Sequence, residues 1–192
     1  MTLQQEFNSW LTPTAVDVQA TPEIGSKAPS SEKLTIPHPN GKPTIITFLR
    51  HCGCPFAEKS FLTLRALANT HPNINFIAIS HSSPSSTDNW VISLGGSWSV
   101  EVTVDESREL YAQWGLGTSS AWHVLNPWSL WGAYSLGKGE GIWNRPTESG
   151  TRWQTAGSWA IDGEGVVRWG GAAKAADEIQ DFKEAVRVLE GK

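Results

Sequence analysis

Residues 44–55, TIITFLRHCGCP, join an apolar, β-branched run to a turn with two cysteines and a proline. The run from Thr44 to Leu49 shows no polar alternation, which is typical of a strand covered on both faces in a parallel sheet. Pro55 suits the first position of a helix because its fixed φ fits there and its missing N–H would have no partner. We therefore predict a central strand, a cysteine-containing turn, and a helix that begins at Cys54 or Pro55.

The next segments repeat this alternation of strand and helix. Ala57, Phe61, Leu64 and Ala68 have the spacing of one helical face. Residues 75–80 form a second apolar run, and the helical crossover makes the two strands parallel. Three further elements are expected: a helix over 84–94, a strand over 100–104 and a short helix over 106–114.

The C-terminal part returns to β structure after a long irregular insertion. Residues 117–157 are rich in Gly, Pro and Trp, with a brief helix expected to open at Asn126-Pro127. Residues 158–161 and 166–169 flank an Asp-Gly-Glu-Gly turn, which predicts a hairpin that closes the sheet. A last helix is expected with Asp177 as its cap. The pattern predicts an α/β protein whose sheet is flanked by helices.

Composition and charge exclude several classes of protein. The chain has 192 residues, of which 39% are hydrophobic and 18% charged, and no apolar run is long enough to span a membrane. A net charge of -4 without a basic block argues against nucleic acid as a partner. Two cysteines do not make a secreted disulfide framework, so we expect a cytoplasmic protein. We expect an N-terminal arm over residues 1–23 and one domain over 24–192.

The two cysteines are the first candidates for chemistry. A thiol at a helix N-terminus meets the positive end of the helix dipole, which lowers its pKa from the usual value of about 8.5 and makes Cys54 a candidate nucleophile. Arg50 and His51 stand nearby in the sequence and would add to this effect. Cys54 as a small buried apolar residue is the alternative. Cys52 either resolves an oxidised Cys54 through a bend at Gly53 or faces the core.

Tryptophan is the other unusual feature of the composition. The chain has eleven tryptophans beside one methionine and two tyrosines. Their rings suit either a core or the wall of a pocket for a flat, apolar ligand. The candidate substrate-binding residues are Trp122, His123, Trp128, Trp131, Arg145, Trp153 and Trp159. A metal site is disfavoured, because the Cys-x-Cys spacing has no second pair of ligands.

Four fragments resemble one known family. Residues 25–29, GSKAP, resemble the N-terminal G-x-x-A-P of peroxiredoxins. Residues 48–56, 111–116 and 154–159 resemble the peroxiredoxin-like 2 branch of the AhpC/TSA group, particularly its fungal members. The order of the elements is also that of a thioredoxin-like fold. The resemblance implies a thioredoxin-like, peroxiredoxin-like sheet with a Trp-rich insertion.

The same resemblance makes Cys54 the counterpart of the family's nucleophilic cysteine. Two departures from the family are plain. The second cysteine of the G-C-P-F-C motif is replaced by Ala57, and the position three residues after Thr47, where typical peroxiredoxins carry their cysteine, is Arg50. Cys52 has no standard counterpart.

We predict a thiol-dependent oxidoreductase that acts on a peroxide, a disulfide or another electrophilic small molecule. Cys54 would attack, Arg50 would stabilise negative charge, and His51 would move a proton. Cys52, or an external thiol such as glutathione or thioredoxin, would resolve the intermediate. No cofactor is expected, and a homodimer is left open. Two alternatives stand beside this prediction: a tailoring enzyme of secondary metabolism with a Trp-lined pocket and no redox cycling, and a non-catalytic binding module.

Overall fold

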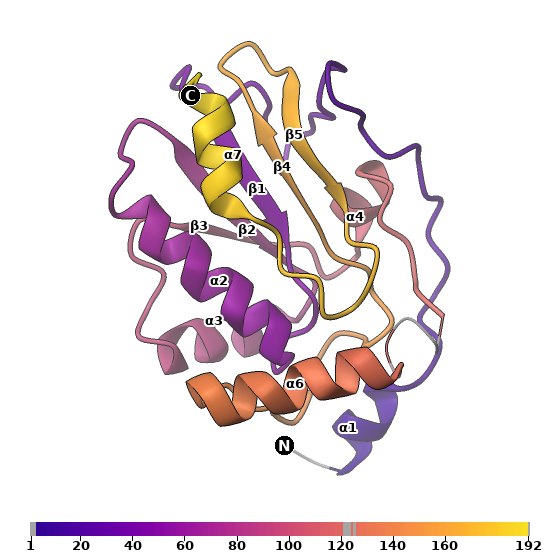
Figure 1. Cartoon of the computed structure of the whole chain (residues 1–192). Helices are drawn as coiled ribbons and strands as arrows, with labels where there is room; N and C mark the ends of the chain where they lie inside the picture. Colours follow the sequence, from indigo (N-terminus) through magenta and orange to yellow (C-terminus); the bar gives the residue numbers. More distant parts are fainter. Residues whose placement is uncertain (1–2, 121–123, 125, 192) are drawn as a thin grey trace.

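A mixed β-sheet runs through the centre of the molecule (Figure 1). The computed structural model describes residues 3–120, 124 and 126–191. The strand order in this part of the chain is β3-β2-β1-β4-β5, with β2 parallel to β1 and β3, and β4 antiparallel to β1 and β5. The strands are β1 (Thr44–Phe48), β2 (Asn75–Ser80), β3 (Glu101–Val104), β4 (Gly157–Ile161) and β5 (Val167–Ala172). The predicted parallel crossover and the closing hairpin are thus confirmed.

Helices cover both faces of this sheet (Figure 1). The described part of the chain includes the helices α1 (Leu3–Ser9), α2 (Pro55–Ala68), α3 (Pro84–Ser93), α4 (Glu109–Gln113), α6 (Pro127–Glu140) and α7 (Phe182–Leu189). α2 and α7 pack together on one face, and α6 lies across the N-terminal end of α2. No helix in the described part of the chain is long and apolar enough to cross a membrane.

Four helices differ from the expectation. α6, expected to be brief, runs for 14 residues from Pro127 to Glu140. α1 forms within the expected N-terminal arm. α4 begins at Glu109 rather than at Glu106. α7 begins at Phe182 because Asp181, not Asp177, caps it: the Asp181 side chain accepts hydrogen bonds from two backbone N–H groups of the first turn. Asp177 instead accepts a hydrogen bond from Ser129 of α6 at 2.6 Å.

The core lies on both faces of β1, which explains the missing alternation in its sequence. Every residue of β1 is buried. Ile45 belongs to the apolar cluster under α2 and α7, whereas Ile46 and Phe48 belong to the cluster on the opposite face. Phe48 packs there against Tyr111 and two tryptophan rings. A strand buried on both faces has no solvent side to carry polar residues.

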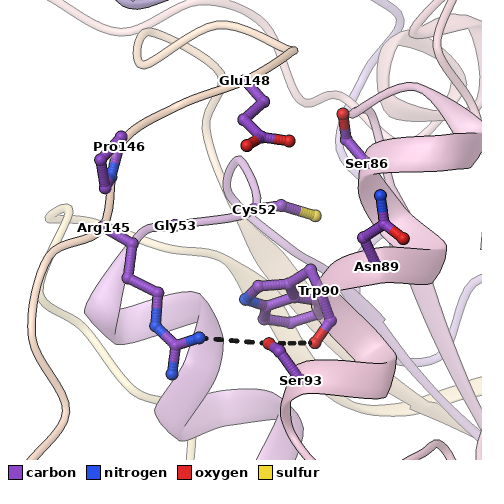
Figure 2. Close-up of a pocket in the computed structure, with 9 residues that line it drawn as sticks. All are labelled: Cys52, Gly53, Ser86, Asn89, Trp90, Ser93, Arg145, Pro146 and Glu148. Carbon is purple, nitrogen blue, oxygen red and sulfur yellow. Dashed lines mark hydrogen bonds between the residues drawn. The ribbon is translucent and has the colours of Figure 1, made fainter. Parts of the chain in front are cut away.

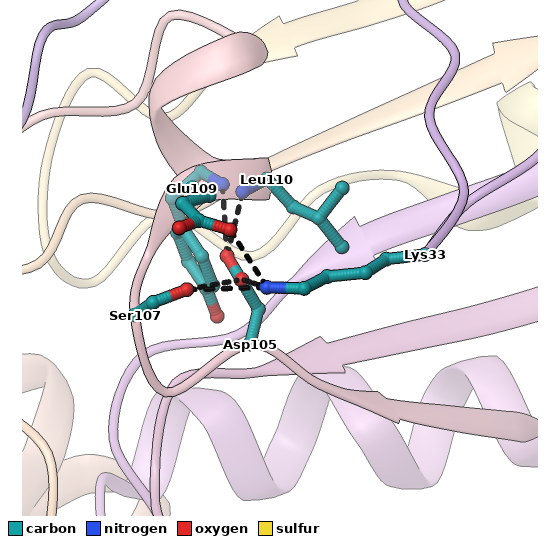
Figure 3. Close-up of polar contacts among 6 residues, drawn as sticks. Lys33, Asp105, Ser107, Glu109 and Leu110 are labelled. Carbon is teal, nitrogen blue, oxygen red and sulfur yellow. Dashed lines mark hydrogen bonds and ion pairs between the residues drawn. The ribbon is translucent and has the colours of Figure 1, made fainter.

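A polar cluster fixes the start of α4 (Figure 3). Asp105 Oδ2 accepts hydrogen bonds from the backbone N–H groups of Leu110 at 2.8 Å and Tyr111 at 3.3 Å. Lys33 Nζ lies 2.8 Å from Glu109 Oε2 and 3.5 Å from Asp105 Oδ1. Asp105 therefore satisfies N–H groups that a helix start leaves unpaired, and it holds α4 and Tyr111 against the sheet.

Candidate active site at the β1–α2 turn

The ends of β1 and β2 are tied together below the cysteine-containing turn. The Tyr111 hydroxyl lies 2.6 Å from the carbonyl oxygen of Leu49 and 2.8 Å from that of Ile79. Parallel strands place their carboxyl ends at the same edge of a sheet, where α/β proteins bind their ligands. The turn from Arg50 to Cys54 leaves this edge, so it is a natural place for a site.

A cavity of about 260 Å³ opens beside this turn (Figure 2). Three segments form it: the turn itself, α3, and the chain that follows α6. The Cys52 sulfur points into the space between α3 and the Glu148 carboxylate (Figure 2). The lining residues are Cys52, Gly53, Ser86, Asn89, Trp90, Ser93, Arg145, Pro146 and Glu148.

Hydroxyl groups surround the Cys52 sulfur on its inner side. Its Sγ lies 3.7 Å from Ser80 Oγ and 3.9 Å from Thr87 Oγ1, and these two oxygens are 2.9 Å apart. The Cys52 backbone N–H donates to Ser82 Oγ at 3.1 Å. Burial raises the pKa of the Cys52 thiol, and the three hydroxyl groups act in the opposite direction. The sulfur is therefore protonated at rest, with its S–H directed to Thr87 Oγ1 and the Ser80 hydroxyl beside it.

Cys54 occupies the N-cap position of α2, as predicted. Its side chain makes no capping hydrogen bond to the helix. It is 3% exposed within the apolar cluster under α2 and is not among the lining residues of the cavity, whereas Cys52 is 8% exposed. Both cysteines are free. The assignment of Cys54 as the nucleophile stays a prediction.

Neither Arg50 nor His51 lines the cavity. The Arg50 guanidinium donates to the carbonyl oxygens of Arg152 at 2.6 Å and Ala176 at 3.4 Å. His51 is buried, and within the described structure neither ring nitrogen has a hydrogen-bond partner. Burial, with the nearby charges of Arg50 and Arg152, lowers the pKa of His51 well below its usual value. The buried imidazole of His51 is therefore neutral.

The predicted tryptophans that the structure describes do not gather around one pocket. Trp159 is fully buried on the opposite face of the sheet, with its ring centroid 5.0 Å from that of Trp114. Trp128 and Trp131 lie on α6 and are 71% and 69% exposed. None of these three lines the Cys52 cavity. Trp159 is therefore a core residue, and Trp128 and Trp131 are surface residues.

The other predicted substrate-binding residues lie in different parts of the structure. Trp153 packs edge-on against Trp10, with ring centroids 5.8 Å apart. Trp122 and His123 lie outside the described residues. Of the predicted substrate-binding residues that are described, only Arg145 lines the cavity. Trp90, which the sequence analysis did not single out, lines it as well, at a position one helical turn after Thr87.

Arg145 and Gly53 hold the outer wall of the cavity against the turn. The Arg145 backbone N–H donates to the Gly53 carbonyl oxygen at 2.9 Å. Its guanidinium reaches Ser93 Oγ at 3.1 Å and the carboxylate of Glu58 at 3.3 Å. Gly53 has a φ of 109°, and a Cβ at this position would lie 3.0 Å from the carbonyl oxygens of Arg145 and Pro146. Glycine thus permits this close approach of two backbones.

Comparison with solved structures shows the same fold in peroxiredoxins. A peroxiredoxin-like protein from Aquifex aeolicus is 14% identical, with a TM-score of 0.63, and the match covers 92% of this chain and 91% of that one. The thiol peroxidase from Chromobacterium violaceum is 16% identical, with a TM-score of 0.56 and coverage of 92% and 91%. The yeast mitochondrial 1-Cys peroxiredoxin, described for its thiol resolving mechanism via glutathione/thioredoxin systems, is 14% identical, with a TM-score of 0.55 and coverage of 88% and 75%.

The family assignment comes from sequence. No curated protein matches the chain. The profile described as "AhpC/TSA antioxidant enzyme" matches residues 63–174, which is more than half of the chain and begins after the cysteine-containing turn. Together with the thioredoxin-like sheet, this match confirms the predicted resemblance. The chain belongs to the AhpC/TSA antioxidant enzyme family.

Proposed function

We propose that the protein is a thiol-dependent oxidoreductase that reduces an organic peroxide in the cavity beside Cys52. The observation that carries this proposal is the Cys52 sulfur, which opens onto the cavity and has hydroxyl groups of Ser80 and Thr87 behind it. Membership of a family of antioxidant enzymes supports the reaction class. Cys52 therefore takes the role that the sequence analysis gave to Cys54.

The first step is attack by the Cys52 thiolate on one peroxide oxygen. An S–O bond forms and the O–O bond breaks: the sulfur is oxidised to a sulfenic acid, and the other peroxide oxygen leaves as an alcohol after taking up the proton that the Cys52 thiol lost. The hydroxyl groups of Ser80 and Thr87 donate hydrogen bonds to the thiolate. Arg145 lines the outer wall of the cavity, where its guanidinium is bound to Ser93 and Glu58.

A low-molecular-weight thiol completes the cycle. It attacks the sulfenic sulfur, releases water and forms a mixed disulfide; a second thiol then frees Cys52 as the oxidised external disulfide leaves. An external reductant, as in the glutathione/thioredoxin systems described for the yeast 1-Cys peroxiredoxin, suits this scheme, since Cys54 does not line the cavity. We place the reaction in the cytoplasm, where such thiols stay reduced. The homodimer left open by the sequence stays a prediction.

The test compares Cys52→Ser with Cys54→Ser. Each variant is supplied with cumene hydroperoxide and glutathione, and the sulfenic acid is trapped with dimedone and located by mass spectrometry. We expect Cys52→Ser to lose peroxide consumption and the adduct, and Cys54→Ser to keep both. Loss in Cys54→Ser alone would restore the nucleophile predicted from the sequence, and full activity in both variants would reject the oxidoreductase.

One observation favours the two alternatives without redox chemistry. Burial raises the pKa of the Cys52 thiol, which disfavours the reactive thiolate. A binding module, or a tailoring enzyme without redox cycling, would use the same cavity with Trp90 as an apolar contact. A small molecule that raises the melting temperature of both cysteine variants equally, in a protein that consumes no peroxide, would support these alternatives.

A further inference from the structure

The carboxylate of Glu6 binds the chain that forms the outer wall of the Cys52 cavity. Its Oε2 accepts a hydrogen bond from the backbone N–H of Thr147 at 2.8 Å. Its Oε1 forms an ion pair with Arg152, whose side chain is almost fully buried. Burial raises the pKa of Glu6, but the Thr147 hydrogen bond and the Arg152 charge outweigh it and lower that pKa. One side chain near the N-terminus thus bridges two points of a distant segment.

The rest of α1 strengthens the contact with Arg152. The backbone N–H and the Nε of Arg152 donate to the carbonyl oxygen and the hydroxyl of Ser9, at 3.0 and 3.2 Å. The guanidinium lies 4.8 Å from the ring centroid of Trp10, a cation–π distance. Trp153 Nε1 donates to the Trp10 carbonyl oxygen at 3.0 Å. Arg152 is therefore bonded to α1, and its neighbour Trp153 is bonded to Trp10, the residue that follows this helix.

The bound segment has no regular structure to set its own shape. Residues 142–153 form neither helix nor strand. Thr147 stands between Pro146 and Glu148, which both line the cavity. On the inner side the segment is bonded to the cysteine-containing turn through Arg145 and Gly53. Its position over Cys52 therefore depends on contacts at both sides, and Glu6 supplies the outer ones.

We propose that Glu6 is a positioning residue of the active site, which holds Thr147 and Arg152 so that the wall over Cys52 keeps its place. α1 is then a part of the site and not a separate arm. The effect on catalysis rests on the proposed function, but the effect on access to Cys52 does not. A loosened wall exposes the sulfur, whatever reaction it performs.

The first measurement is the alkylation of Cys52 by iodoacetamide, followed by mass spectrometry. Glu6→Ala removes both acceptors and should raise the alkylation rate of Cys52 about tenfold, through local opening of the wall. Glu6→Gln keeps one acceptor oxygen and should give a smaller rise. Glu23→Ala removes an exposed carboxylate from the same N-terminal region and should leave the rate unchanged. Wild-type alkylation rates in both Glu6 variants would overturn the proposal.

Hydrogen exchange gives a second readout that does not depend on the cysteine. The Thr147 amide proton should exchange faster in Glu6→Gln than in the wild type or Glu23→Ala, because its acceptor is weakened. If Glu6→Ala does not fold, the Glu6→Gln comparison alone decides. Unchanged exchange in peptides that contain Thr147 would also contradict the role of Glu6.

Kinetics then distinguish failure of this inference from failure of the proposed function. In an active enzyme, Glu6→Gln should raise KM for cumene hydroperoxide by about fivefold with little change in kcat, since the wall binds substrate but does not react. Faster alkylation in a protein that consumes no peroxide would support the positioning role and reject the oxidoreductase. Peroxide reduction with unchanged alkylation and KM would support the oxidoreductase and reject the positioning role of Glu6.

Discussion

The Cys52 sulfur lies 3.7 Å from the hydroxyl oxygen of Ser80, so the turn after β1 meets the last residue of β2. Thr87 of α3 reaches both groups, at 3.9 and 2.9 Å. The strand and the helix thus each contribute one hydroxyl oxygen to the inner side of the sulfur, which the turn supplies. Because buried polar groups need partners, this hydroxyl pair also accounts for the polar end of β2 within an apolar core.

The first prediction concerns this hydroxyl pair. Thr87→Val keeps the shape of the side chain but removes a hydroxyl that counteracts the effect of burial on Cys52. We expect the pKa of the Cys52 thiol to rise further, which moves the pH profile of its alkylation to higher pH. Mass spectrometry separates this profile from that of Cys54, which serves as the internal control. An unshifted Cys52 profile would show that the Thr87 hydroxyl does not act on the sulfur.

The second prediction concerns the glycine between the cysteines. Gly53→Ala places a Cβ 3.0 Å from two carbonyl oxygens at a φ of 109°, and should lower the free energy of unfolding by about 3 kcal/mol. Gly41→Ala is the matched control, because Gly41 also has a positive φ, 70°, but no atom within 4 Å of the added carbon. Its cost should be about 1 kcal/mol. Equal losses in urea unfolding would show that the close approach of the two backbones is unimportant.

The third prediction concerns stability in acid. Burial, with the charges of Arg108 and Arg50, lowers the pKa of His81 from 6.5 to about 4. Below pH 6.5 the unfolded chain binds a proton that the native protein does not, so stability falls as the pH falls from about 6.5 to about 4. His81 alone should cost about 2 kcal/mol between pH 7.5 and pH 5, and His51 acts in the same direction.

Urea unfolding at the two pH values measures this loss. In His81→Gln, whose amide retains an acceptor for the Thr151 N–H, the difference between pH 7.5 and pH 5 should shrink by about 2 kcal/mol. The same pH dependence in wild type and variant would mean that His81 titrates normally in the folded protein.

The fourth prediction separates the tryptophans by burial. Trp114→Ala removes a fully buried ring and should cost about 3–5 kcal/mol of unfolding free energy. Trp131→Ala removes an exposed ring from α6 and should cost less than about 0.5 kcal/mol. In the peroxide assay Trp131→Ala should keep the wild-type KM, whereas Trp90→Ala, in the cavity wall, should raise it. A raised KM in Trp131→Ala would show that the exposed tryptophans of α6 contribute to substrate binding.

The sequence predicted the elements whose signals are local. β1 is buried on both faces, which leaves its mark as an apolar run without alternation, and Pro55 marks the start of α2. α1 has no such signal, because Glu6 and Ser9 are held by residues more than 130 positions away. The cap of α7 was misplaced for a related reason: Asp177 has the right residue type, but its side chain binds α6 instead.

The candidate site was predicted only in part. Its place at the end of β1 follows from the rules of parallel sheets, and the cysteine-containing turn is there. The side to which each sulfur points depends on the φ of Gly53, which residue spacing does not reveal. Trp90 could not be predicted as a cavity residue, because its helix carries no chemical motif and it lies far from Arg145 in the sequence.

The outer wall of the cavity, residues 145–148, and its floor belong to different parts of the chain. The floor comes from the turn after β1 and from α3, which also contribute to the core, whereas the wall comes from a segment without regular structure. Specificity can consequently diverge faster than reactivity. Grafting a relative's loop onto this scaffold would exchange ligand preference while leaving the sulfur and its hydroxyl neighbours intact.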